Sequence, residues 1–290
     1  VAVVQGAVPQ DEKWIDSNLD SIAELYQRLT REAHGASIIF WPESAVPDLA
    51  NNHIHFYRDV YQEASAKGSS LVMGTLRAEV NPKTGEEEYF NSVLVMDRET
   101  PGVAWHDKHH LVPFVEFFPV PQFVRNWLRL MSLPYSDFNR GAAQQAPLQA
   151  AGQRIAPGVC YEGAYGATLL PVMATTKDWQ GATMLANVTN DAWFGRSTAR
   201  YQHMQISRLR AMETGRPMVR AANDGISAVI GAHGEVLARA PEYEANVMRA
   251  NLQPRVGLTP YARIGNWPIV CLALVFGLFG AYLGRRGRKI

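Results

Sequence analysis

Short apolar runs, each followed by glycine, proline or a polar cluster, recur along the first third of the chain. Residues 1–5, 37–40, 71–74 and 91–96 are mostly β-branched or aliphatic and carry no charge. Runs of this length and composition predict buried strands. Another strand is expected at 103–108, where the run ends on charged residues.

Between and after these runs, apolar positions recur at the spacing of an amphipathic helix. The predicted helices span 17–33, 53–67, 165–176 and 202–214. Further strands are expected at 158–160, 182–188, 218–222 and 227–230. Strands and helices alternate early, and strand pairs appear in the middle and at the end. This mixture predicts an α/β fold in which sheets are covered by helices.

The longest apolar run lies close to the C-terminus. Residues 267–284 contain no charged side chain, and at ~1.5 Å per residue they span roughly 27 Å, close to a bilayer core of ~30 Å. Trp267 and Tyr282 stand near the two ends, as interfacial anchors do. The run predicts one transmembrane helix. The alternative is a buried C-terminal helix of a soluble protein.

Basic residues crowd directly behind this run, in the segment 285–290. By the positive-inside rule we expect a cytoplasmic C-terminus and a preceding domain on the outer face of the membrane. The predicted organisation is a globular domain at 1–265, a membrane helix at 266–284 and a basic cytoplasmic tail at 285–290. The chain opens on Val1, inside a predicted strand, so we expect an upstream membrane or targeting region to be missing.

Composition and charge narrow the classes of function. The formal net charge is +1, which implies no strong attraction to nucleic acid. Adjacent histidines at 109–110 and the pair His53 and His55 are weak metal-ligand patterns without further ligands nearby. We therefore expect no metal site.

Three polar residues each close an apolar run and together fit thiol chemistry. They are Glu43, Lys108 and Cys160. A free thiol has a pKa of about 8.5 and is mostly protonated at neutral pH. A carboxylate base can take its proton, while an ammonium and a backbone N–H stabilise the oxyanion formed on the attacked carbonyl. Taken singly, each residue has an ordinary alternative: a core cysteine, a surface lysine and a solvated glutamate.

The segments around these residues resemble the three signatures of the nitrilase (carbon–nitrogen hydrolase) superfamily. They are Trp41-Pro42-Glu43-Ser44, the stretch 107–119 (DKHHLVPFVEFFP) and the stretch 158–162 (GVCYE). The resemblance implies a four-layer αββα sandwich with a Glu-Lys-Cys triad. It gives Glu43 the role of general base, Lys108 that of stabilising the intermediate and Cys160 that of nucleophile.

Within the superfamily, the chain is most similar to the bacterial apolipoprotein N-acyltransferases. Three further segments carry this resemblance: 190–195 (NDAWFG) followed by Gln202-His203, 262–268 (ARIGNWP) and the closing apolar helix. The resemblance implies two steps, without a cofactor. A phospholipid acylates Cys160, and the amine of the lipid-modified N-terminal cysteine of an apolipoprotein then takes the acyl chain. It also implies a bundle of membrane helices ahead of residue 1.

The resemblance assigns several further residues to the site. Glu116 stands where the family has a glutamate that orients the lysine, and Val115 stands where a glycine is common. Residues expected to bind substrate or support the triad are Trp14, Tyr161, Glu162, Trp193 and Phe194. Without the resemblance, the ordinary alternative for Glu116 and Glu162 is that each is a salt-bridge partner. We expect Asn190-Asp191 to be a loop that shapes the pocket by hydrogen bonds to backbone, rather than a catalytic dyad.

Two alternatives to acyl transfer stay open at this point. One is a membrane-anchored amidase or nitrilase that hydrolyses a small amide, and the other is an inactive scaffold that binds lipid or protein. The aromatic stretch 114–133 is either a core helix after a proline turn or an apolar flap that contacts lipid. Retention of all three triad residues argues against the scaffold.

Overall fold

The computed structural model describes residues 1–120 and 138–287, with side chains up to Arg285. Most of the aromatic stretch predicted at 114–133 therefore lies outside the described residues, as does the end of the basic tail. Phe114 and Val115, at the start of this stretch, are described and are exposed. These two residues are therefore not part of the hydrophobic core.

The first of two sheets contains the N-terminal strands. Its strands are β1 (Ala2–Gln5), β2 (Ile38–Trp41), β3 (Ser70–Val80), β4 (Glu87–Met96), β5 (Val103–Asp107) and β12 (Asn246–Arg249), in the order β12-β1-β2-β3-β4-β5. The parallel strands β1, β2 and β3 form one part, and β4, β5 and β12 pair antiparallel to their neighbours. Strand β12 was not predicted, because its four residues are half polar.

The second sheet repeats this arrangement. Its strands are β6 (Leu148–Ala150), β7 (Gln153–Val159), β8 (Met184–Thr189), β9 (Met218–Ala222), β10 (Ala228–Ile230) and β11 (Val236–Arg239), in the order β11-β10-β9-β8-β7-β6. The central strands β7, β8 and β9 are parallel. The strand predicted at 158–160 begins earlier than expected, at Gln153. It ends one residue before the predicted end, because Cys160 already belongs to a 3₁₀ turn, η3 (Cys160–Ala164).

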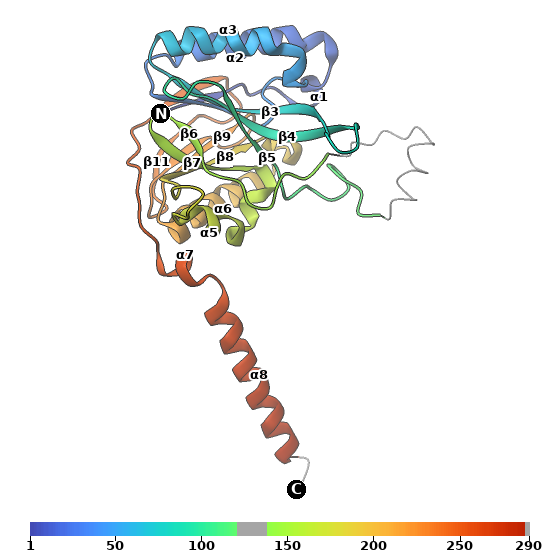
Figure 1. The fold of residues 1–290 in the computed structure, drawn as a ribbon, viewed down its shortest axis with the longest axis vertical. Coiled ribbons are helices and arrows are strands. Elements are labelled where there is room, and N and C mark those ends of the chain that lie inside the picture. The colour runs from blue at the N-terminus through green and yellow to red at the C-terminus, as the bar shows by residue number, and fades with distance from the viewer. Residues whose placement is uncertain (121–137, 288–290) are drawn as a thin grey trace.

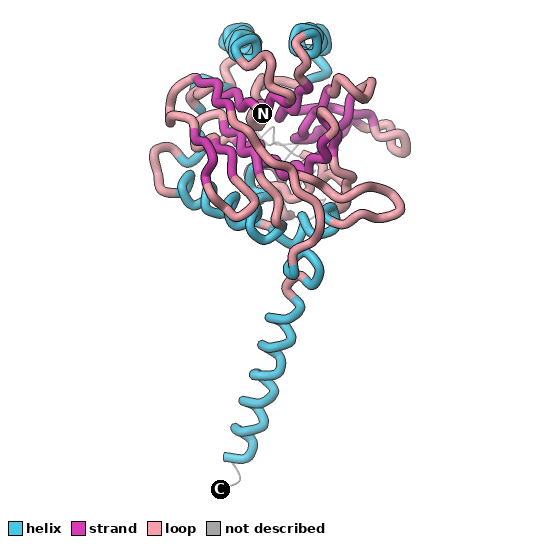
Figure 2. Tube along the Cα trace, turned by 90° about the vertical axis from the view of Figure 1, so that its left-hand side faces the viewer, coloured by secondary structure: helices cyan, strands magenta, loops and turns pink. Residues whose placement is uncertain are grey.

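Helices cover the outer face of each sheet. Helices α2 (Leu19–Glu32) and α3 (Ile54–Ala66) lie over the first sheet, and α5 (Gly166–Met173) and α6 (Ala199–Thr214) lie over the second (Figures 1 and 2). A short helix, α1 (Gln10–Lys13), precedes α2. The predicted four-layer αββα sandwich is confirmed. It follows from strands that are apolar on both faces and helices that are apolar on one.

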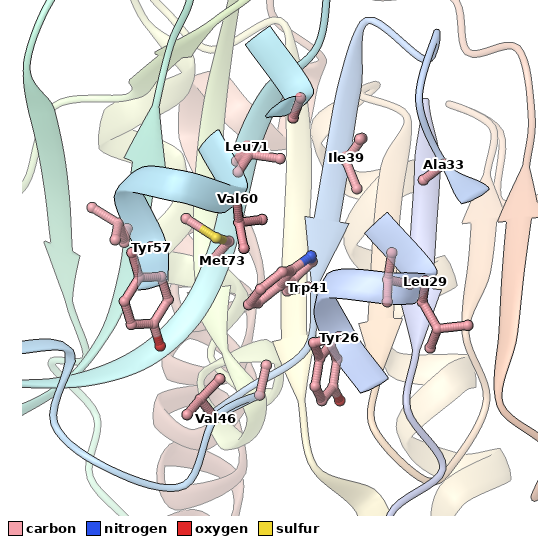
Figure 3. Packing of buried hydrophobic residues seen from close by; sticks show 14 of the residues in the cluster. Tyr26, Leu29, Ala33, Ile39, Trp41, Val46, Tyr57, Val60, Leu71 and Met73 are labelled. Carbon is pink, nitrogen blue, oxygen red and sulfur yellow. The ribbon is translucent and has the colours of Figure 1, made fainter. Parts of the chain in front are cut away.

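Three apolar layers hold the sandwich together. Between the first sheet and its helices, Trp41 packs on Tyr26 with ring centroids 5.1 Å apart (Figure 3). The Trp41 indole also donates a hydrogen bond to Thr30 Oγ1 at 2.9 Å, so its polar atom is satisfied inside the core. The second layer lies between the two sheets, and the third lies between the second sheet and α5 and α6.

The C-terminal helix α8 (Trp267–Gly287) leaves the sandwich altogether. It follows the short helix α7 (Pro260–Ile264) and projects away from the layer formed by α5 and α6 (Figures 1 and 2). Its apolar span, Trp267–Arg285, is long enough to cross a membrane by length and composition, and none of it is buried. The alternative of a helix buried against the domain is therefore wrong. So continuous an apolar surface is unfavourable in water.

Candidate active site

The three predicted catalytic residues all follow strands. Glu43 comes two residues after β2 and Lys108 directly after β5, both in the first sheet, whereas Cys160 comes directly after β7 in the second sheet. All three lie where strands run out into loops, and the two sheets bring them to one place. Glu43 and Lys108 lie 3.6 Å apart, and the charges of both groups act on the pKa of the Cys160 thiol.

The Glu43 carboxylate is almost fully buried and held from two sides. Its Oε1 accepts a hydrogen bond from Asn91 Nδ2 at 2.7 Å and lies 3.6 Å from Lys108 Nζ. Its Oε2 accepts from the backbone N–H of Asn190 at 2.9 Å. These contacts leave the carboxylate little freedom to rotate, so its orientation in the site is fixed.

The backbone around Glu43 is equally constrained. The next residue, Ser44, has φ +46°, a conformation that non-glycine residues adopt rarely. Gly74 on β3 lies so close that a Cβ atom there would overlap the Pro42 carbonyl and the Glu43 backbone. Lys13 is buried and donates from Nζ to the Glu43 carbonyl oxygen at 3.1 Å. Its burial lowers the pKa of Lys13 to about 8, against the opposing charge of Glu43.

Lys108 lies between two carboxylates. Its Nζ is 2.8 Å from Glu116 Oε2 and 2.9 Å from Glu116 Oε1, and its side chain is 1% exposed. Burial alone would lower the pKa of Lys108, but the negative groups around it, led by Glu43, outweigh burial and raise that pKa above its usual value. Lys108 is therefore a permanent, fixed cation at this site.

The Glu116 carboxylate accepts hydrogen bonds from three different donors, one of which is the Lys108 ammonium. Besides the ammonium, it accepts from Asn91 Nδ2 at 2.9 Å and from the backbone N–H of Val112 at 2.8 Å. Asn91 thus bridges the two carboxylates, Glu43 and Glu116, with one amide group. The salt-bridge alternative for Glu116 and its predicted role in orienting Lys108 describe the same contact.

We expect Glu116→Ala to slow acylation of Cys160 by about 10- to 100-fold while the protein stays folded, because Lys108 loses its orienting partner but keeps Glu43. Acylation is measured with an activated ester, and folding by thermal melting. Glu87→Ala is the matched control, because Glu87 is exposed at the start of β4. Full activity of Glu116→Ala would contradict the role given to Glu116.

Cys160 is held in a left-handed backbone conformation, with φ +48°. Non-glycine residues hold such a conformation only where their surroundings impose it, and it is frequent at active sites. Burial, together with the charge of Glu43, raises the pKa of the Cys160 thiol to about 12, although Lys108 and a hydrogen bond with Thr189 oppose this. The resting thiol is therefore neutral and needs a base.

Glu162 connects the loops that carry Cys160 and Lys108. Its Oε1 accepts from the backbone N–H groups of His109 and His110 at 2.8 and 3.1 Å, and its Oε2 accepts from that of Val159 at 2.9 Å. Its hydrogen bonds in the described structure come from backbone groups. Glu162 therefore supports the geometry of the site. These contacts do not fit the alternative that Glu162 is an ion-pair partner.

The aromatic residues assigned to the site are largely exposed. Trp14, Tyr161, Trp193 and Phe194 all present side-chain surface to the outside. The Tyr161 hydroxyl accepts from that of Tyr165 at 2.8 Å. They carry no hydrogen bond to Glu43 or Lys108 among the contacts described, so their part in substrate binding remains a prediction.

A network behind Cys160 was missed by sequence reasoning. Asp191 is fully buried and binds Arg220 Nη2 at 2.5 Å and His203 Nδ1 at 2.9 Å. Asn190-Asp191 was expected to bind backbone groups. The hydrogen bonds described for the Asp191 carboxylate come from side chains instead. An arginine in the apolar strand Met218–Ala222 was the available signal, because a buried strand rarely holds an unpaired charge.

A cavity of about 60 Å³ lies on the helix side of the Cys160 loop. Its lining includes His106, His110, Glu162 and Asn187. Among the described residues, no group of three His, Cys, Asp or Glu side chains is arranged to hold a metal ion, and His53 pairs with Asp48 at 2.8 Å.

Comparison with solved structures gives the class of fold. A carbon–nitrogen hydrolase from Helicobacter pylori matches with a TM-score of 0.59 and 14% identity, covering 85% of this chain and 86% of that one. The amidase from Nesterenkonia sp. AN1, carrying the acetamide moiety of fluoroacetamide on its active-site cysteine, matches with a TM-score of 0.55 and 19% identity over 85% and 87% of the two chains. Both share the nitrilase-like sandwich.

Residues 1–261 match the model of the carbon–nitrogen hydrolase family, and the chain belongs to that family. Relatives named apolipoprotein N-acyltransferase match over nearly the whole chain. That of Photobacterium profundum is 37% identical over 280 residues, covering 94% of this chain and 52% of the relative. That of Chromobacterium violaceum is 40% identical over 294 residues, covering 99% and 54%. The chain spans about half the length of the curated relatives it matches.

Proposed function

We propose that this chain is the catalytic part of an apolipoprotein N-acyltransferase. It moves an acyl chain from a phospholipid to the N-terminal amine of the lipid-modified cysteine of apolipoproteins, through a thioester on Cys160. The observation that carries the proposal is the pairing of a buried Glu43–Lys108–Glu116 cluster with the Cys160 loop. The 37–40% identity to relatives of that name supports the substrate class.

In the first step the thiol attacks the ester carbonyl of the phospholipid. The proton passes from sulfur to Glu43 as the S–C bond forms. Lys108 and a backbone N–H stabilise the oxyanion. Collapse breaks the C–O bond, and Glu43 returns the proton to the departing alkoxide. A lysophospholipid leaves, and the acyl group stays on Cys160.

In the second step the amine of the acceptor attacks the thioester. Glu43 takes a proton from the attacking nitrogen, the C–N bond forms and the C–S bond breaks. The proton then returns to the sulfur, which restores the neutral thiol that a pKa of about 12 favours. The same base and the same oxyanion site serve both halves, as a ping-pong transfer requires.

Location at the membrane follows from the substrates. The domain comprises residues 1–265, the segment 266–284, which forms most of α8, anchors it as a transmembrane helix, and the basic tail at 285–290 stays cytoplasmic. The domain then faces the outer side of the bacterial inner membrane. The apolar, unburied span of α8 and the basic residues after it support this orientation.

The decisive experiment is intact-protein mass spectrometry of the full-length membrane form. The protein is incubated with a phospholipid and no acceptor, beside Cys160→Ala. We expect an acyl adduct on the wild type only, removed by hydroxylamine, because only a thioester forms on the sulfur. A peptide that begins with a lipid-modified cysteine should then collect the acyl chain, and its N-acetylated counterpart should not.

The alternatives predict other results. An amidase would show no lipid adduct and would release ammonia from small amides. An inactive scaffold would show neither. An adduct that only water removes, with the free-amine peptide left unchanged, would also overturn the transferase proposal.

A further inference from the structure

The carbonyl oxygen of Cys160 is held by two side chains that take no part in the proposed proton transfers. His203 Nε2 on α6 lies 3.1 Å from it, and Asn187 Nδ2 on β8 donates to it at 3.4 Å. Both residues belong to the second sheet and its helix layer. The contacts fix the peptide group that joins Cys160 to Tyr161.

His203 is itself fixed at its other ring nitrogen. Its Nδ1 lies 2.9 Å from Asp191 Oδ1. The carboxylate of Asp191 is anchored by Arg220 at 2.5 Å and by the Thr189 hydroxyl at 3.0 Å. Burial would raise the pKa of Asp191, but Arg220 and His203 outweigh it and hold that pKa well below its usual value. Asp191 is therefore ionised and only accepts.

Both partners of the His203 ring are thus acceptors, a carboxylate and a carbonyl. The ring therefore links the buried Asp191 carboxylate to the Cys160 carbonyl through its two nitrogens. Together with the contact from Asn187, this link constrains a residue already held at φ +48°.

The direction of this constraint matters for the chemistry. Cys160 packs on the apolar layer between the two sheets, toward the first sheet that carries Glu43 and Lys108. Its carbonyl points the other way, toward α6. In a planar trans peptide the N–H points opposite to the C=O, and the residues that the structure describes, Cys160 and Tyr161 among them, include no cis peptide bond. The N–H of Tyr161 is therefore turned to the side of the thiol.

We infer that His203 is a positioning residue. Through the Cys160 carbonyl it aims the Tyr161 N–H at the oxyanion that forms on the attacked carbonyl, opposite Lys108. The chain Arg220–Asp191–His203 holds this peptide in place. The inference rests on the thioester chemistry of the proposed function, but it concerns acylation of Cys160 alone and holds for any acyl donor.

The test compares two reactions of the same thiol in the full-length protein. Acylation by a p-nitrophenyl ester passes through an oxyanion: the S–C bond forms, the C–O bond breaks, and the proton passes through Glu43 to the nitrophenolate. Alkylation by iodoacetamide displaces iodide without any oxyanion. His203→Phe keeps a planar aromatic ring and removes both ring nitrogens. We expect it to slow acylation by at least about tenfold and to leave alkylation unchanged.

Two further variants sharpen the test. His203→Gln keeps one N–H group for the Cys160 carbonyl, so we expect part of the acylation rate to return. His53→Phe is the matched control, because His53 also pairs with an aspartate, Asp48, but lies in η2 (Ala50–His53), ahead of α3 on the other outer face of the sandwich. It should change neither reaction.

Equal slowing of both reactions in His203→Phe would overturn the inference, because His203 would then hold the thiol or the fold. Unchanged acylation would overturn it as well. Neither result touches the proposed function, which is read separately from the phospholipid adduct and the acceptor peptide. Conversely, failure of the phospholipid experiment with a normal ester reaction would leave the role of His203 intact.

Discussion

Glu43→Gln is expected to slow acylation of Cys160 by about 10²- to 10⁴-fold, the usual contribution of a general base. The thiol has a pKa of about 12, so at pH 7 only about one molecule in 10⁵ carries the thiolate. Glutamine fills the same space and still accepts one of the hydrogen bonds from Asn91 and Asn190. It cannot take the proton, so the variant depends on that small thiolate fraction.

The pH dependence distinguishes this cause from a damaged site. Loss of the Glu43 charge lowers the thiol pKa somewhat, but it stays far above neutral because burial is its largest cause. The thiolate fraction, and with it the rate of the variant, should then rise about tenfold per pH unit between about pH 7 and 9. The wild-type rate should rise less. Glu63→Gln is the control, because Glu63 is a half-exposed glutamate paired with Arg31 on the outer helices. A slow rate that does not change with pH would contradict the role of Glu43.

Lys108→Met is expected to slow acylation by about 10²- to 10³-fold, because the oxyanion loses its charged partner. It should also destabilise the protein by about 3–5 kcal/mol, since the carboxylates of Glu43 and Glu116 stay buried without their cation. The rate is read with the p-nitrophenyl ester, and stability by urea unfolding.

A double variant separates the two effects. Lys108→Met combined with Glu116→Gln removes one positive and one negative charge. Glu43 then remains as a single buried carboxylate, with hydrogen bonds from Asn91 and Asn190. We expect much of the stability to return, but not the rate. Recovery of both would show that Lys108 acts through folding alone and would contradict its role at the oxyanion.

Much of the fold was readable from local patterns. The strands β1, β2 and β3 and the helices α2 and α3 were predicted because each is a continuous apolar run or an amphipathic stretch whose period shows in the residues themselves. The short strands β6, β11 and β12 were missed, since runs of only three or four residues carry little pattern of their own and become strands only when a neighbouring strand pairs with them.

The same division holds at the site. By itself the sequence determined that a glutamate, a lysine and a cysteine each end an apolar run, that the segments around them are those of the carbon–nitrogen hydrolases, and that an uncharged helix closes the chain. Only the tertiary structure decided what surrounds them. Glu43 and its donor Asn190 are 147 residues apart, and His203 meets the Cys160 carbonyl from another layer. Such contacts depend on how two sheets and their helices pack, which no local pattern records.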